Sequence, residues 1–425
     1  MKALIIFLLL VLSGLSAFSD DSTRTFNDLY QEGITAYRAG DYDTFVDRFE
    51  EIIKQRPDHP ASLYNLACGY ALKGDHKKSL AYLKKLAARG IDMGAEADSD
   101  FESLRDTDEF RKLVASLQYL REPVNNSRVA FTIPEQSLFP EGIAFDPIKK
   151  HFYLGSIYRR KIIRIAPDGS AESFVDDKQD GLLAVLGMRV DPVRRILWAC
   201  CTGSGNMIDK QPGDDTLAGL FAYSLEDGRL IKKYILNDSV VHDLNDVAIY
   251  TDGRAYVTDS RTGAVFMADL IKDTLKTVIE AGIFIGSNGI DFTPDGKYLF
   301  VADYGSTLYR IKMSDLSLKE IKCPGKNSLY GIDGLYFYDG DLVAIQNGIR
   351  PHRVIRLRLN GSLDKVKKCD IIEMNHPDFA EPTTGAIAGD EFYYIANSQI
   401  QLLNSNWTEL PSERLKNTVI LKTDL

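Results

Sequence analysis

The sequence contains little histidine, cysteine or tryptophan: its 425 residues include six His, five Cys and two Trp. The histidines are scattered along the chain, which argues against a zinc centre. The chain also has no Gly-x-Ser-x-Gly elbow, no His-Glu-x-x-His pair and no Gly-x-x-x-x-Gly-Lys loop. These absences exclude the serine-elbow hydrolases, the zincin peptidases and the P-loop nucleotide-binding proteins.

The cysteines are odd in number and their spacing gives no framework, so at most two disulfides can form. Cys323 and Cys369 are the pair we would expect if one forms. Cys200 and Cys201 are adjacent on a predicted strand and read as small core residues. The formal net charge is −9 and no basic cluster stands out, so we expect neither nucleic acid nor an anionic membrane surface as a partner.

The chain begins with features of a signal peptide. Lys2 is followed by an apolar run from Ala3 to Leu12 and then by small residues up to Ser19. The run is too short to serve as a comfortable membrane anchor, so no integral membrane segment is expected after cleavage. Residues 1–19 therefore predict a secreted or periplasmic protein.

Residues 20–120 show helical periodicity and an internal repeat. Gly40-Asp41 and Gly74-Asp75 are 34 residues apart, and each dipeptide predicts a turn between two helices. The segment resembles two tetratricopeptide repeats with a degenerate third helix pair over residues 98–117. Such helices commonly hold a peptide or protein partner, but they can equally be a structural cap. Residues 121–126 read as a linker.

Six copies of a related sequence motif, called phrases below, follow in residues 127–425. Each copy has an opening residue that is usually followed by Gly. A predicted strand of alternating apolar residues, a turn and a second predicted strand come next. The phrases begin at Glu141, Leu186, Asn245, Asn288, Asp333 and Thr384. Their spacings of 45, 59, 43, 45 and 51 residues match a four-stranded propeller blade. We therefore predict an all-β six-bladed propeller, closed by pairing of the run 127–133 with the last blade.

The first residues of the six phrases should form a ring at one end of the propeller channel, because each holds the same position in its blade. Four of them, Glu141, Asn245, Asn288 and Asp333, bear carboxylate or carboxamide oxygens. Oxygen ligands without Cys or His favour a hard divalent cation such as Ca²⁺. The alternative is that these side chains only satisfy backbone groups around a water-filled channel.

Several of these segments resemble one known family. Pro140-Glu141-Gly142, Leu244-Asn245-Asp246, Ser287-Asn288-Gly289 and Ile332-Asp333-Gly334 look like motifs of the gluconolactonase, senescence marker protein and luciferin-regenerating enzyme family. That family is related to the paraoxonases and to diisopropyl fluorophosphatase. The resemblance implies that Glu141, Asn245, Asn288 and Asp333 hold a catalytic divalent cation, usually Ca²⁺.

The resemblance further implies an enzyme that hydrolyses a small-molecule lactone or ester. Asp333 would act as general base or nucleophile, and Asn245 would contact both metal and substrate. His242, Asp246 and Thr384 are further candidates for the pocket. Gln346-Asn347-Gly348 stands where the paraoxonases carry a catalytic His. Two alternatives remain: a non-catalytic binding propeller with a structural metal and a partner-recruiting helical domain, or, less favoured, a metal-free propeller of the strictosidine-synthase type.

Overall fold

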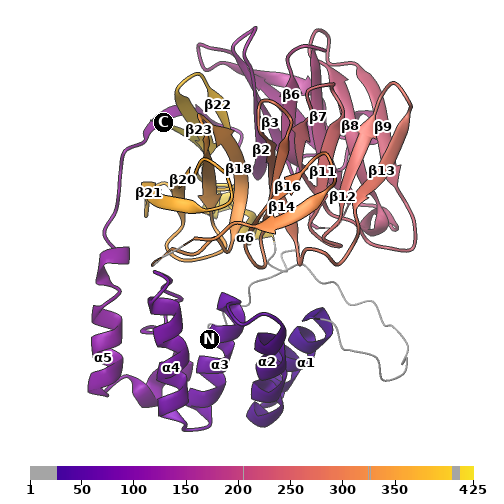
Figure 1. Ribbon diagram of the computed structural model, residues 1–425. Coiled ribbons are helices and arrows are strands. Elements are labelled where there is room, and N and C mark those ends of the chain that lie inside the picture. The colour runs from indigo at the N-terminus through magenta and orange to yellow at the C-terminus, as the bar shows by residue number, and fades with distance from the viewer. Residues whose placement is uncertain (1–25, 204, 324, 326, 404–411) are drawn as a thin grey trace. The chain divides into compact units, whose positions relative to one another are not determined.

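The computed structural model describes residues 26–203, 205–323, 325, 327–403 and 412–425 (Figure 1). The predicted signal peptide lies outside these residues. The chain forms two compact units. The helical unit extends to Glu122 and also includes Gly325–Tyr330 and Ile349–Pro351, and the propeller unit contains the rest.

The helical unit confirms the helices predicted before the propeller. Its α-helices are α1 (Phe26–Ala39), α2 (Tyr42–Gln55), α3 (Pro60–Leu72), α4 (His76–Ala87) and α5 (Asp108–Ala115), with short 3₁₀ helices at Ser99–Leu104 and Gln118–Leu120. Helix α1 packs on α2 and α3 packs on α4. Whether these pairs are tetratricopeptide repeats stays a prediction.

Both predicted turns lie between helices, and their residues explain why. Gly40 and Gly74 have φ angles of 77° and 80°, which glycine adopts without the steric cost of a side chain. The next residues cap the following helices: Asp41 accepts a hydrogen bond from Thr44 N, and Asp75 accepts one from Lys78 N. The repeated Gly-Asp pair therefore ends one helix and begins the next.

The propeller unit contains six four-stranded antiparallel sheets, as predicted (Figure 1). The first three blades are β2 (Pro140–Asp146), β3 (His151–Ser156), β4 (Lys161–Ile165) and β5 (Ala171–Val175); β6 (Ala184–Asp191), β7 (Ile196–Thr202), β8 (Ala218–Ser224) and β9 (Leu230–Leu236); and β10 (Leu244–Ile249), β11 (Ala255–Asp259), β12 (Val265–Asp269) and β13 (Thr274–Ile279).

The fourth and fifth blades are β14 (Ser287–Phe292), β15 (Tyr298–Asp303), β16 (Leu308–Lys312) and β17 (Ser317–Glu320); and β18 (Ile332–Tyr338), β19 (Asp341–Gln346), β20 (Arg353–Leu359) and β21 (Val366–Met374). The sixth has the order β22 (Gly385–Ala388), β23 (Glu391–Ile395), β24 (Thr418–Asp424) and β1 (Arg128–Ile133). A short helix, α6 (Ile400–Leu403), follows β23.

The ends of the propeller are joined as the sequence predicts. Strand β1 pairs antiparallel with β24, with Val129 opposite Leu421 and Ile133 opposite Thr418. Each blade packs its inner strand against the next: β2, β6, β10, β14, β18 and β22 contact one another in turn, and β22 contacts β2. Closure gives every blade a packed neighbour on both sides and arranges the six inner strands around one axis.

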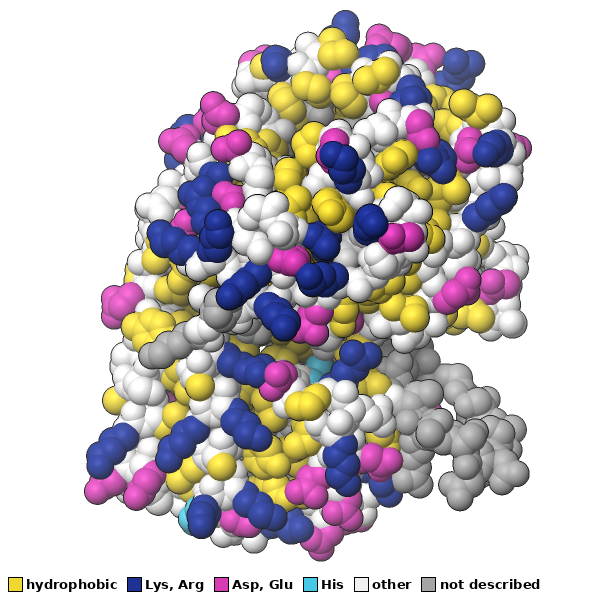
Figure 2. Space-filling model, viewed as in Figure 1, with side chains coloured by type: hydrophobic (Ala, Val, Ile, Leu, Met, Phe, Trp, Pro, Cys, Tyr) yellow, Lys and Arg dark blue, Asp and Glu magenta, His cyan; other side chains and the backbone are white. Residues whose placement is uncertain are grey.

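Apolar side chains fill the spaces between blades, and Cys200 and Cys201 belong to this interior. Cys200 and Cys201 are fully buried in two different hydrophobic clusters, which agrees with side chains that alternate across a strand. All five cysteines are free thiols, Cys323 and Cys369 included. No helix among the described residues is long and apolar enough to cross a membrane. Figure 2 shows cationic and anionic side chains interspersed over the face in view.

Candidate metal centre

The six phrase-opening residues lie at equivalent places in their blades. Five are the second or third residue of an inner strand, and Thr384 directly precedes β22. In each of those five blades the pairing of the inner strand with its neighbour shifts register across the opening residue and the residue after it. A bulge of this kind redirects side chains and often lies beside a functional site. The same irregularity, repeated five times, turns these residues out of the regular sheet pattern.

The glycine after the opening residue lets successive blades approach closely. A Cβ atom on Gly142 would lie 2.0 Å from the carbonyl oxygen of Leu186, and one on Gly289 would lie 2.2 Å from that of Asp333. On Gly187 it would lie 2.5 Å from the carbonyl oxygen of Asn245. Any side chain there would force the backbones apart, which explains the recurrent Gly of the phrase.

Hydroxyl groups complete the circle. Thr258 Oγ1 donates to the Asn288 carbonyl at 2.8 Å and accepts from Asp246 N at 3.0 Å, which ties the third blade to the fourth. Thr383 Oγ1 donates to the Glu141 carbonyl at 3.0 Å, and Thr384 Oγ1 donates to the same atom. The backbone of the predicted ring is therefore contiguous from the first blade to the sixth.

The acidic side chains of this ring are buried and close enough to influence one another. Glu141 and Asp333 are 5% and 6% exposed. Burial, followed by the charges of Asp333 and Asp246, raises the pKa of Glu141 well above its ordinary value. Burial also raises the pKa of Asp333 to about 7, although hydrogen bonds from Asn347 and Asn288 oppose the rise. Without a cation, the site thus favours protonated carboxyl groups.

Four oxygens at this site have no hydrogen-bond partner within the described part of the chain. They are Glu141 Oε2, Asn245 Oδ1, Asp246 Oδ2 and Asn288 Oδ1. A buried polar atom left without a partner costs free energy, so native proteins rarely leave several together. Carboxylate and carboxamide oxygens are the ligands that Ca²⁺ and Mg²⁺ prefer. The residues present therefore fit a hard divalent cation.

Asp246, which the sequence offered only as a further pocket candidate, is one of the buried acidic residues beside the ring. It is 3% exposed, and one carboxylate oxygen accepts from Val247 N at 2.8 Å while the other has no partner in the described chain. Burial raises its pKa to about 6, and the charge of Arg189 opposes this rise. Asp246 thus adds a third carboxylate to the two predicted ones.

Asp333 is held by a residue that the sequence did not single out as a partner. Asn347 Nδ2 donates to Asp333 Oδ2 at 2.5 Å and to the Pro382 carbonyl at 2.9 Å. Asn347 Oδ1 in turn accepts from the Tyr304 hydroxyl at 3.0 Å. Asn347 therefore orients the Asp333 carboxylate. The charge of Glu381 also raises the pKa of Asp333, which places a further carboxylate in its neighbourhood.

Three other predicted residues have different surroundings. Leu186 occupies its ring position with an apolar side chain that packs among the blade cores. The Thr384 hydroxyl is engaged with the Glu141 carbonyl. His242 Nδ1 lies 2.6 Å from Asp259 Oδ2, its Nε2 lies 3.3 Å from Asp238, and its ring packs edge-on against Phe266. Both nitrogens of His242 are thus occupied by carboxylates outside the ring.

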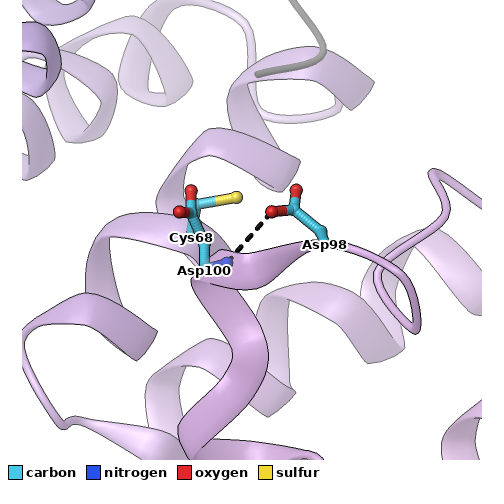
Figure 3. Close-up of side chains that lie close together, drawn as sticks. All are labelled: Cys68, Asp98 and Asp100. Carbon is cyan, nitrogen blue, oxygen red and sulfur yellow. Dashed lines mark hydrogen bonds between the residues drawn. The ribbon is translucent and has the colours of Figure 1, made fainter. Parts of the chain in front are cut away.

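The helical unit contains a second buried acidic cluster, formed by Cys68, Asp98 and Asp100 (Figure 3). One ligand atom from each lies within 4.8 Å of the others. Here the carboxylates already accept hydrogen bonds: Asp98 from the Tyr64 hydroxyl at 2.7 Å and from Asp100 N at 3.0 Å, and Asp100 from the Tyr37 hydroxyl. These bonds connect α1 and α3 to the segment that begins the 3₁₀ helix at Ser99–Leu104, so the cluster stabilises the packing of the helical unit.

Solved structures with a similar fold include a gluconolactonase from Xanthomonas campestris, with 13% identity over 72% of this chain and 93% of that chain and a TM-score of 0.49. A luciferin-regenerating enzyme has 14% identity over 72% and 96%, with a TM-score of 0.47. Virginiamycin B lyase from Staphylococcus aureus has 13% identity over 69% and 98%, with a TM-score of 0.45. At these identities and scores, the similarities carry no information about substrate or activity.

No curated protein is significantly similar to the chain in sequence. The family model described as SMP-30/Gluconolactonase/LRE-like region matches residues 139–368, which is more than half of the chain and includes all four predicted metal ligands. Proteins of this family typically bind a divalent metal ion, and the unpartnered oxygens of the ring are of the kind that such an ion prefers. The chain belongs to the SMP-30/gluconolactonase/LRE-like family.

Proposed function

We propose that the protein is an exported, Ca²⁺-dependent hydrolase of a lactone or carboxylic ester. The observation that carries this proposal is the set of four buried oxygens without partners in the described chain, contributed by Glu141, Asn245, Asp246 and Asn288. These residues and Asp333 belong to the inner strands of the first, third, fourth and fifth blades. A purely structural ring would be expected to satisfy these atoms internally, as the Cys68 cluster does.

Glu141, Asn245, Asn288 and Asp333 would hold the cation, with Asp246 close to them. When bound, a divalent cation supplies a Lewis acid that polarises a carbonyl oxygen and stabilises the negative charge developing on it. Ca²⁺ is favoured because the donors are all oxygens and come from separate strands, and Ca²⁺ tolerates irregular coordination of six to eight ligands. Lactones and esters fit because their reactive carbonyl needs this polarisation.

Asp333 is the residue we assign to the attack. Asn347 holds one of its carboxylate oxygens, so the other is kept in a constant direction. Burial raises the pKa of Asp333 to about 7 in the metal-free chain, and a bound cation would keep this carboxylate ionised near neutral pH, so that it can accept a proton from water. The alternative role for the same carboxylate is direct attack on the carbonyl carbon. Asn245 would contact the substrate as well as the cation.

Export follows from the predicted signal peptide, residues 1–19, and calcium is abundant enough outside the cytoplasm to occupy a weak site. The competing proposal is a propeller that binds its ligand without turnover, with the helical unit recruiting a protein partner. In the competing proposal the metal is structural, and only the enzyme would turn over a substrate with the Asp333 carboxylate as base or nucleophile.

The test is hydrolysis of a panel of aldonolactones and aryl esters by the full chain, with Ca²⁺ or with a chelator. We expect turnover that the chelator abolishes and that Ca²⁺ restores. A matched control is Asp339→Asn, which changes an exposed carboxylate in the turn between β18 and β19 and should leave the rate unchanged. Turnover insensitive to the chelator would refute the metal-dependent reaction, and ligand binding without turnover would favour the competing proposal.

A further inference from the structure

One cationic side chain bridges inner strands beside the ring. Arg189 belongs to β6, three residues after Leu186, and 23% of its side chain is exposed. Its Nε donates to the Val247 carbonyl of β10 at 3.2 Å, and its Nη2 donates to the Ile290 carbonyl of β14 at 3.2 Å. A single guanidinium therefore joins the inner strands of three successive blades.

The groups that face Arg189 are acidic or electron-rich. Asp291 Oδ1 of β14 lies 3.8 Å from Nη2, and the guanidinium carbon lies 5.3 Å from the centre of the Tyr336 ring of β18. From β10, Asp246 interacts with Arg189 electrostatically. Asp291 is itself fixed, because its carboxylate accepts from Phe292 N at 3.0 Å and from Phe337 N at 2.9 Å. Arg189 is thus held by four inner strands.

The charges in the channel show what this arginine does for the metal centre. Glu141, Asp246, Asp333 and Asp291 can together carry four negative charges, and a divalent cation supplies only two positive ones. Buried charges are costly unless they are compensated nearby. A guanidinium remains protonated at any pH that a protein tolerates, so it supplies its charge whether or not a cation is bound.

We propose that Arg189 is a positioning residue that serves as the permanent counter-charge of the metal centre, holding the metal-free channel together while lowering the affinity for the cation. The inference rests on the proposed function in that it takes the ring as the cation site. It predicts effects of opposite sign, because the hydrogen bonds stabilise the inner strands whereas the positive charge repels a divalent cation. A residue with only a structural role would weaken folding and binding together.

The experiment compares Arg189→Gln, Arg189→Lys and a control, Arg164→Gln, in the full chain. Arg164 pairs with Glu172 on the outer strands of the first blade, so its replacement removes the same charge away from the axis. Ca²⁺ affinity is measured by isothermal titration calorimetry on metal-free protein. Thermal unfolding is recorded in chelator and in saturating CaCl₂.

For Arg189→Gln we expect Ca²⁺ binding that is tighter by roughly tenfold or more, since a charge is removed from a poorly screened channel. Its Tm in chelator should be lower than that of the wild type, and Ca²⁺ should close the gap. Arg189→Lys keeps the charge but cannot make both backbone bonds, so we expect a lower metal-free Tm with an affinity within about threefold of the wild type. Arg164→Gln should change neither property.

Unchanged or weaker Ca²⁺ binding by folded Arg189→Gln would overturn the inference while leaving the proposed function intact. If Arg189→Gln does not fold, Arg189→Lys decides, because a tenfold change in affinity with the charge retained would contradict a charge effect. Binding by Arg189→Gln but not by the wild type would support the inference and refute the proposed function. If neither binds Ca²⁺, both are wrong.

Discussion

The chain buries two acidic clusters, and they differ in how their oxygens are satisfied. In the helical unit, Asp98 and Asp100 accept hydrogen bonds from tyrosine hydroxyls and a backbone amide. At the propeller axis, Glu141 and Asp246 each keep an oxygen without a partner in the described chain. The helical cluster stabilises the fold with groups of its own. The axial cluster leaves oxygens without partners in the described chain, and this supports the cation site proposed above.

The largest difference between the two clusters is expected when one charge is removed from each. Asp333→Asn should lower kcat/KM for the hydrolysed lactone or ester by about 10³-fold or more, because the amide cannot accept a proton from water. Asp98→Asn should leave kcat/KM unchanged and lower only the Tm. Steady-state kinetics on both variants provides the measurement. Equal loss of activity in both variants would mean that the two clusters do not differ in function.

The pH dependence of stability without metal tests the raised pKa of Asp333 in the axial cluster. The pKa of Asp333 is 3.8 ordinarily and about 7 in the folded chain. Below pH 3.8 the Asp333 carboxyl is protonated in both the folded and the unfolded chain, and its contribution to stability is complete. Between pH 3.8 and 7 the unfolded chain loses this proton while the folded chain keeps it, so the contribution is lost as the pH rises through 7. We expect the Tm in chelator to fall by at least roughly 4 °C between pH 5 and pH 8.

Saturating Ca²⁺ should remove most of this fall, since the cation stabilises the ionised carboxylates. Asp333→Asn, which cannot ionise at this position, should show a shallower dependence in chelator. Differential scanning calorimetry over this pH range gives both results. A metal-free Tm that rises steadily with pH in the wild type would contradict the assigned direction of the pKa shift.

Asn347 tests whether the axial cluster depends on its supporting hydrogen bonds. Asn347→Ala removes the donor to Asp333 Oδ2, and we expect Ca²⁺ affinity or kcat/KM to fall by roughly 10- to 100-fold. Asn360→Ala is a suitable control in the same blade, because Asn360 donates to Asp364 in a surface turn. Calorimetric titration distinguishes loss of affinity from loss of rate. No change in either quantity would exclude Asn347 as the residue that orients Asp333.

The smallest effect is expected in the helical cluster. Tyr64→Phe leaves one oxygen of Asp98 without its donor, which should lower the free energy of unfolding by about 1–3 kcal/mol. Ca²⁺ affinity should not change. Chemical denaturation followed by circular dichroism measures the first quantity, with Tyr119→Phe, an exposed tyrosine, as the control. Altered Ca²⁺ binding in Tyr64→Phe would show that the two clusters are coupled.

Much of the fold could be predicted from the sequence because its signals are local and repeated. The alternation of apolar residues, the turns and the spacing of Glu141, Asn245, Asn288 and Asp333 depend on backbone geometry that is the same in every blade. The turns at Gly40 and Gly74 likewise follow from residues beside them in the chain. Closure by β1 was predictable because a propeller requires it.

Proximity in sequence does not decide how the neighbours of a ring residue are placed. His242 lies three residues before Asn245, yet it turns to Asp259 and Phe266. Asp246 follows Asn245 directly and does enter the axial cluster, because the register shift between Leu244 and Val247 places both residues outside the regular pairing. No pattern of residue types distinguishes these two outcomes.

The amino-acid sequence is enough to show six similar units and the oxygen-bearing residues that open four of them. Only the folded chain shows which other side chains bond to the ring and its strands: Arg189 to the Val247 and Ile290 carbonyls, Asn347 to Asp333, and Thr383 to the Glu141 carbonyl. The reason is physical. Repeats specify where a backbone position recurs, whereas hydrogen-bond partners depend on bulges and blade contacts that form only when the ring closes.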